Sequence, residues 1–94
     1  PYFPSSRRDI SFLISENQET SAILKIIKQL KIPILHDIII FDVYKGENIE
    51  SGRISVALGL IFQAKSRTLT DNEIDKYMSQ IKGQVVSNFE IKIR

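Results

Sequence analysis

The spacing of the apolar residues switches between two periods along the chain, and the order of these switches constrains the fold more than any other feature. From Arg8 to Ile14 apolar residues occupy every second position, which is typical of a half-buried strand. From about Thr20 to Lys31 they recur at the spacing of one helical face, and Pro33 prevents the helix from continuing. The chain therefore opens with a strand followed by a helix.

The rest of the chain repeats this order with one additional strand. The isoleucine-rich segment Ile34–Lys45 and the alternating segment Arg53–Lys65 flank a polar turn, which predicts an antiparallel hairpin. The run Thr70–Glu73 fits a capping box at the start of a second apolar helical stripe. The segment Glu90–Arg94 alternates again and predicts a last strand.

The resulting order, β-α-β-β-α-β, predicts an α+β fold of the ferredoxin-like kind. Right-handed crossovers place both helices on one face of a four-stranded antiparallel sheet, and the other face stays open. The length of 94 residues suits one domain. Because the chain begins without methionine in a proline-rich stretch, we expect residues 1–7 to be an extended linker from a longer parent chain and residues 8–94 to form the domain.

Strict alternation divides the strand side chains between the two faces of the sheet. The side chains expected to face the helices are Ile10, Phe12, Ile14, Phe41, Val43, Val56, Leu58, Leu60, Phe62, Ile91 and Ile93. Those expected on the open face are Asp9, Ser11, Asp42, Tyr44, Ser55, Gly59, Gln63 and Lys92, with the apolar Leu13, Ile38, Ile40 and Ile61.

Composition and motifs exclude several classes of function. The chain has no cysteine, which rules out disulfides and thiolate metal sites, favours a reducing compartment and leads us to expect a cytoplasmic protein. No apolar run approaches the length of about 20 residues that a membrane span needs, so we expect no membrane partner. The single histidine, His36, stands beside Asp37, but no nucleophile lies at a recognisable distance. We therefore expect no catalytic residue and no metal ligand.

The open face offers a candidate site for an RNA base. Tyr44 is the aromatic residue expected there, and Asp42 lies two positions earlier on the same side. A tyrosine ring stacks a base, and a neighbouring carboxylate accepts two hydrogen bonds from the Watson–Crick edge of guanine. Ser11, Ser55 and Gly59 are small neighbours that leave room for a splayed base. Arg7 and Arg8 enter the first strand near the sheet, where they can neutralise phosphate.

Two alternatives remain open at this point. Asp42 can instead pair with Arg8 or Lys92 across the sheet, while Tyr44 covers apolar neighbours. The apolar residues expected on the open face also suit a regulatory or dimerisation module, because an exposed apolar patch often marks an interface.

Four runs of the sequence resemble a known family. They are Arg7–Ile10, Phe41–Glu47, Ser55–Leu58 and Ser66–Glu73. In this order and with these loop lengths, they resemble the C-terminal ferredoxin-fold anticodon-binding domain of the bacterial phenylalanyl-tRNA synthetase β subunit. The resemblance covers nearly the whole chain.

The resemblance implies a parent enzyme in which catalysis and anticodon binding reside in different domains. That enzyme is a heterotetramer of two α and two β subunits, which joins phenylalanine to its tRNA with ATP and Mg²⁺ and carries its catalytic site in the α subunit. The resembling domain is non-catalytic, needs no cofactor and holds the anticodon stem-loop of tRNA(Phe).

The family places its guanine contacts at the positions of Asp42, Tyr44 and Ser55, with that of Ser11 nearby. Gly59 departs from relatives, which often carry a larger or polar side chain there. Arg67 belongs to the matching runs without a role that follows from its position.

Overall fold

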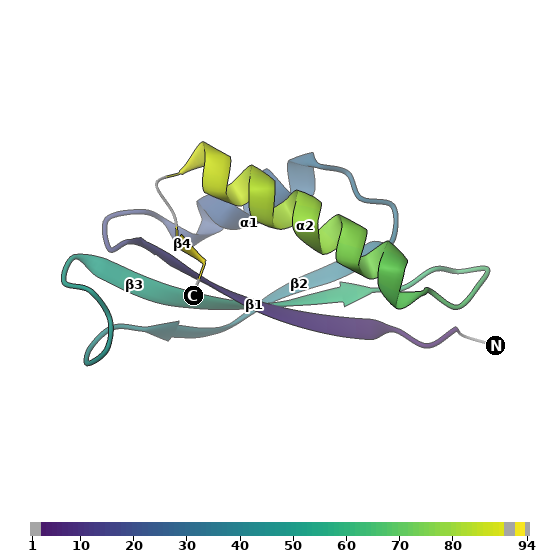
Figure 1. The fold of residues 1–94 in the computed structure, drawn as a ribbon, viewed down its shortest axis with the longest axis horizontal. Helices are drawn as coiled ribbons and strands as arrows, with labels where there is room; N and C mark the ends of the chain where they lie inside the picture. The colour runs from purple at the N-terminus through teal and green to yellow at the C-terminus, as the bar shows by residue number, and fades with distance from the viewer. Residues whose placement is uncertain (1–2, 90–91, 94) are drawn as a thin grey trace.

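The computed structural model describes residues 3–89 and the backbone of residues 92–93, and it shows a sheet covered on one face by two helices (Figure 1). In chain order the elements are β1 (Ser6–Ser15), α1 (Thr20–Gln29), β2 (Leu35–Tyr44), β3 (Arg53–Phe62), α2 (Asp71–Asn88) and β4 (Lys92–Ile93). The first strand begins at Ser6, so the last two residues of the expected linker belong to the sheet. The order of elements is that of the predicted ferredoxin-like α+β fold.

The sheet has the strand order β2-β3-β1-β4, with β1 and β3 in the centre. Three antiparallel strands of ten residues each form its body. Of the strand expected over Glu90–Arg94, the described part is the two-residue β4, which pairs with Phe12 and Leu13 of β1. Glu90, Ile91 and Arg94 lie outside the described residues, so the expected fourth strand is shown in part.

The core lies between the sheet and the two helices. Alternation in the central strands sends Phe12 of β1 and Leu58 and Phe62 of β3 toward the helices, and each is 0% exposed. Ile23 of α1 and Ile81 of α2 meet them from the other layer and are also fully buried. Each such side chain contributes about 1.5–3 kcal/mol by leaving water, which fixes the helices on this face and leaves the other face open.

Local sequence signals set the ends of both helices. After α1 ends at Gln29, Lys31 takes a left-handed backbone with φ of 51°, and Pro33 follows. At the start of α2, the Thr70 hydroxyl accepts a bond of 3.2 Å from the Glu73 amide, and the Glu73 carboxylate accepts one of 3.2 Å from the Thr70 amide. The predicted capping box is confirmed.

Two interruptions of the pairing in β2 correct the predicted division of its side chains. The register against β3 shifts between Leu35 and Asp37 and again between Ile40 and Asp42. Each shift adds an unpaired residue to β2, and the alternation restarts after it.

The restarted alternation reverses part of the expected pattern. Ile38 and Ile40 pack against the core, although they were predicted on the open face. Phe41 is the additional residue of the second shift and is 49% exposed, so its predicted place among the helix-facing residues is wrong. Beyond the shift, Asp42 and Tyr44 pair with the open-face positions Ala57 and Ser55, as predicted.

Candidate nucleic-acid interface

The pairing registers arrange the open face into rows that cross the sheet. One row consists of Tyr44, Ser55 and Leu13, and the next of Asp42, Ala57 and Ser11. Neighbouring rows are separated by two residues along each strand, which is about 7 Å. Four predicted site residues, Ser11, Asp42, Tyr44 and Ser55, therefore lie together in two adjacent rows.

The ring of Tyr44 is held in place at its hydroxyl end. Its hydroxyl donates a hydrogen bond of 3.1 Å to the carbonyl oxygen of Glu47, in the turn between β2 and β3. The Tyr44 hydroxyl oxygen lies 3.2 Å from where a Cβ would stand on Gly46, whose φ of 146° suits glycine. The side chain keeps 38% of its surface exposed, so it presents an aromatic surface of fixed position to solvent.

The Asp42 carboxylate is exposed beside this ring. Among the side chains that the structure describes, none forms a hydrogen bond or ion pair with it. The alternative partner Arg8 is engaged on the other face of the sheet, and the side chain of Lys92 lies outside the described residues. Within the described part, the acceptor oxygens of Asp42 face solvent.

Small side chains in β1 and β3 form the floor of these two rows. Ser11 is half-buried, and Ala57 is 8% exposed. Ser55 is 3% exposed, so its hydroxyl lies beneath its larger neighbours rather than at the surface. The floor is low enough for a flat ligand to lie beside Tyr44, and Ser55 supports it mainly through its small size.

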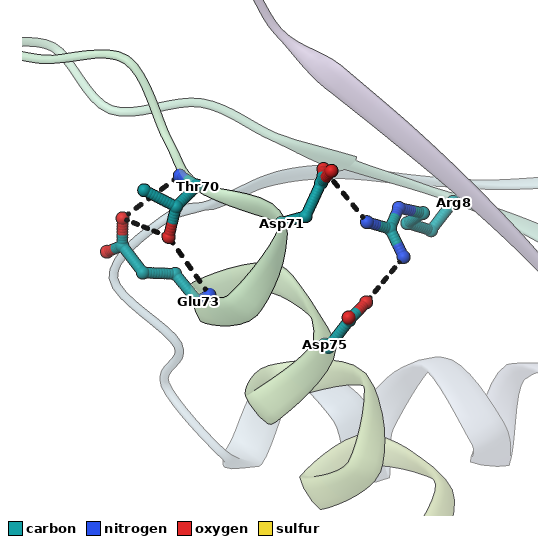
Figure 2. A network of polar contacts seen from close by, with 5 residues as sticks. All are labelled: Arg8, Thr70, Asp71, Glu73 and Asp75. Carbon is teal, nitrogen blue, oxygen red and sulfur yellow. Dashed lines mark hydrogen bonds and ion pairs between the residues drawn. The ribbon is translucent and has the colours of Figure 1, made fainter.

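Arg8 does not join the other predicted site residues, because its side chain points toward the helices. Its guanidinium donates to Asp75 over 2.7 Å and to Asp71 over 3.3 Å, both in the first turns of α2 (Figure 2). The hydrogen bond with Asp75 is the main cause that raises the pKa of Arg8. Arg8 thus links β1 to α2. Because it lies two residues before Ile10 on a regular strand, the alternation of β1 predicts that its side chain points to the helical face of the sheet.

Of the two arginines expected near phosphate, Arg7 lies on the open face. Its Nε donates to the Asp9 carboxylate over 2.8 Å, and its Cζ lies 4.9 Å from the centre of the Phe41 ring. The guanidinium also covers Gly59. The alternation of β1 predicts that Arg7 and Asp9 share the open face. The contact of Arg7 with Phe41 was not predicted, because Phe41 was expected on the helical face.

Arg67 has a structural role at the start of α2. Its Nη1 donates to the Glu73 Oε1 over 2.6 Å, and Glu73 is at the same time part of the capping box (Figure 2 shows the Thr70–Glu73 contacts). The Arg67 hydrogen bond, followed by that from the Thr70 backbone, lowers the pKa of Glu73 from 4.5 to about 2. Arg67 therefore keeps the capping carboxylate ionised.

The part of the chain that the structure describes comprises residues 3–89 and 92–93. In this part of the chain, no helix is long and apolar enough to cross a membrane. No group of three or more histidine, aspartate or glutamate residues gathers there in a geometry that holds a metal ion.

Comparison with known proteins matches the whole chain to one family. The family model described as "Ferredoxin-fold anticodon binding domain" covers residues 1–94. The chain is 35% identical over 92 residues to the phenylalanine–tRNA ligase β subunit of Methylococcus capsulatus, covering 98% of this chain and 12% of that protein.

Two further relatives give the same picture. The chain is 34% identical over 94 residues to the phenylalanine–tRNA ligase β subunit of Thermotoga maritima, and 35% identical over 94 residues to that of Geobacillus kaustophilus. Each match covers 100% of this chain but only 12% of the relative. The chain therefore spans about an eighth of the length of these curated relatives.

Proposed function

The chain belongs to the ferredoxin-fold anticodon-binding domain family, and we propose that it holds the anticodon loop of tRNA(Phe) as part of a phenylalanine–tRNA ligase β subunit. The support is the match of the whole chain to the family and its likeness to β subunits from distant bacteria. The resemblance of the four sequence runs points to the same parent.

Within that parent, the proposed role is binding rather than catalysis. The α subunit carries the catalytic site and uses ATP and Mg²⁺ to charge the tRNA, in a cytoplasmic assembly of two α and two β subunits. This chain contributes the surface that receives the end of the tRNA opposite to the amino acid.

The open-face pair Asp42 and Tyr44 supports the finer proposal that the first anticodon base is read as guanine. Tyr44 stacks on the base from a ring whose hydroxyl end is anchored to the Glu47 carbonyl. Asp42, with its acceptor oxygens turned to solvent, accepts the N1 and N2 hydrogens of guanine. Adenine, cytosine and uracil do not offer two adjacent donors on this edge, so the carboxylate favours guanine over them.

The other predicted contacts take different parts in this proposal. Ser11 supplies a half-buried hydroxyl in the row of Asp42, and Ser55 supplies the low floor under the ring. Arg8 leaves the proposed interface because it is bound to α2. Arg7 is a cation on the open face, where its guanidinium lies over the Phe41 ring. The observation that carries the proposal is the placement of Asp42 and Tyr44 in adjacent rows of one exposed sheet face.

A titration of the isotope-labelled chain with an anticodon stem-loop of tRNA(Phe) tests the proposal. We expect backbone amide shifts at Asp42, Tyr44 and Ser11, while the amides of the exposed lysines of α1, Lys25 and Lys28, stay unchanged. A matched stem-loop with adenine at the first anticodon position should bind more weakly at the same amides.

Two results would contradict the proposal. The first is a set of shifts confined to the helices. The second is concentration-dependent self-association that involves the open face and is indifferent to RNA, which would favour the regulatory or dimerisation module instead. The exposed apolar patch that favoured a regulatory or dimerisation module is smaller than expected, because Ile38 and Ile40 pack on the core.

A further inference from the structure

A second aromatic residue stands on the open face, away from Tyr44. Phe41 is 49% exposed, and the guanidinium of Arg7 lies over its ring at 4.9 Å. Arg7 is held in turn by the Asp9 carboxylate, 2.8 Å from its Nε. The three side chains come from two strands, β1 and β2, and meet above β3, which runs between them.

Gly59 of β3 creates the space in which this arrangement forms. A Cβ on this residue would stand 2.8 Å from one terminal nitrogen of Arg7 and 2.9 Å from its Cζ. The guanidinium therefore lies directly on the backbone of the central strand, where any side chain would push it away. Gly59 is buried although it faces away from the helices, because Arg7 covers it.

The core of the domain does not need the Phe41 ring. The second shift in register makes Phe41 the additional residue of β2, and the core positions around it are filled by Ile38 and Ile40. Val43, two residues further along, is 52% exposed and pairs with Val56 on the helical side. An exposed aromatic ring with a cation over it is thus presented on the same face as Tyr44.

We propose that Phe41, with Arg7 over one face of its ring, is a second stacking platform, which takes an unpaired base of the same anticodon loop other than the first anticodon base. This inference rests on the proposed function. Phe41 stands between the residues that pair with Leu58 and Ala57 of β3, two to three positions from Ser55, so it lies about 7–10 Å from the row of Tyr44. Domains that bind RNA on an open sheet stack two or three bases in this way, on aromatic rings or arginine planes.

Charge favours RNA over a protein segment as the occupant of this platform. The Arg7 side chain is 47% exposed, so it can meet a phosphate while its inner edge stays on Asp9. The neighbouring floor positions are glycine and alanine, which leave a flat surface rather than a pocket shaped for a side chain. A flat, partly cationic aromatic surface suits a nucleobase and its phosphate.

The test is a scan of the anticodon loop with abasic nucleotides, one position at a time, against three proteins. The proteins are the unaltered chain, Phe41→Ala and the matched control Val43→Ala, which removes a side chain of similar exposure from the other side of the same strand. In the unaltered chain and in Val43→Ala, two loop positions should each lose about 5- to 150-fold in affinity when the base is removed. In Phe41→Ala, the first anticodon position should keep its sensitivity and the second sensitive position should lose it.

The outcomes separate this inference from the proposed function. If the unaltered chain does not bind the loop, the proposed function fails. If it binds and Phe41→Ala shows the same abasic profile as Val43→Ala, the proposed function stands and the second platform is refuted, as expected if another part of the parent protein covers Phe41.

The variant Gly59→Ala tests the part played by Arg7. The added methyl displaces a flexible side-chain end and leaves Phe41 in place, so the fold should survive. The sensitivity of the second loop position should fall without vanishing. An unchanged profile in Gly59→Ala would show that Arg7 takes no part in the platform.

Discussion

The adjacent residues Arg7 and Arg8 should respond differently to salt, because they point to opposite faces of the sheet. Arg7 lies on the open face, where its side chain is 47% exposed and bound at one edge by Asp9. Both terminal nitrogens of Arg8 are bound by α2, to Asp75 and Asp71. We therefore expect Arg7→Gln to remove a phosphate contact and Arg8→Gln to leave RNA contacts unchanged.

The size of the effect follows from the release of counterions. Each phosphate neutralised on single-stranded RNA contributes about 0.7 to the slope of log affinity against log salt. Loss of one contact should make the slope shallower by about 0.7, which is about 2.6-fold in affinity across a rise from about 50 to 200 mM salt. Arg8→Gln should keep the slope of the unaltered chain and instead lower the melting temperature, because it unties β1 from α2.

The assay is fluorescence anisotropy of a labelled anticodon stem-loop over a salt series, with thermal melts of both variants. The two variants carry the same chemical change at neighbouring positions, so each serves as the control for the other. A slope change in Arg8→Gln as large as that in Arg7→Gln would refute the assignment of the open face as the RNA surface.

Three further predictions concern the start of α2 and the Tyr44 ring. Thr70→Ala should cost about 1 kcal/mol of unfolding free energy in urea titrations, because it removes the hydroxyl of the capping box. The pKa of Glu73 is lowered to about 2 in the folded chain, so its contribution to stability is present above its ordinary pKa of 4.5 and is lost as pH falls through about 2. Acid unfolding of Glu73→Gln should lack this part of the pH dependence. Identical acid unfolding profiles of the variant and the unaltered chain would refute this role of Glu73. Tyr44→Phe removes the hydrogen bond to Glu47 at a cost of about 1 kcal/mol in stability but keeps the ring, whereas Tyr44→Ala should lose about 1–3 kcal/mol of RNA binding in the anisotropy assay.

The sequence predicts the elements that depend on local patterns and fails where pairing between strands decides. The alternation in β1 and β3, the end of α1 before Pro33 and the capping box at Thr70 are all local signals, and each was predicted correctly. In β2, the residues from Ile38 to Phe41 are apolar at every position, so they carry no signal for one face. Only the register against β3 shows that the alternation restarts there.

The candidate site was predicted in part for the same reason. Asp42 and Tyr44 keep their relative spacing because both lie beyond the second shift in register. Arg8 was expected to neutralise phosphate, but it has the parity of Ile10 on β1 and its guanidinium is bound to Asp75 of α2. The Arg7–Phe41 contact joins two strands across a third, which no local pattern indicates.

The central claim is that the Asp42 carboxylate reads the edge of the first anticodon base, and inosine at that position tests it most directly. Inosine differs from guanine only by the missing N2 amino group, so stacking on Tyr44 and the phosphate contacts are preserved. The unaltered chain should bind the inosine stem-loop more weakly than the guanine stem-loop. The loss of binding free energy should not exceed the about 1–3 kcal/mol that a complete bidentate contact contributes. Asp42→Ala should bind both stem-loops with nearly equal affinity, and an equal inosine penalty in the two proteins would contradict the claim.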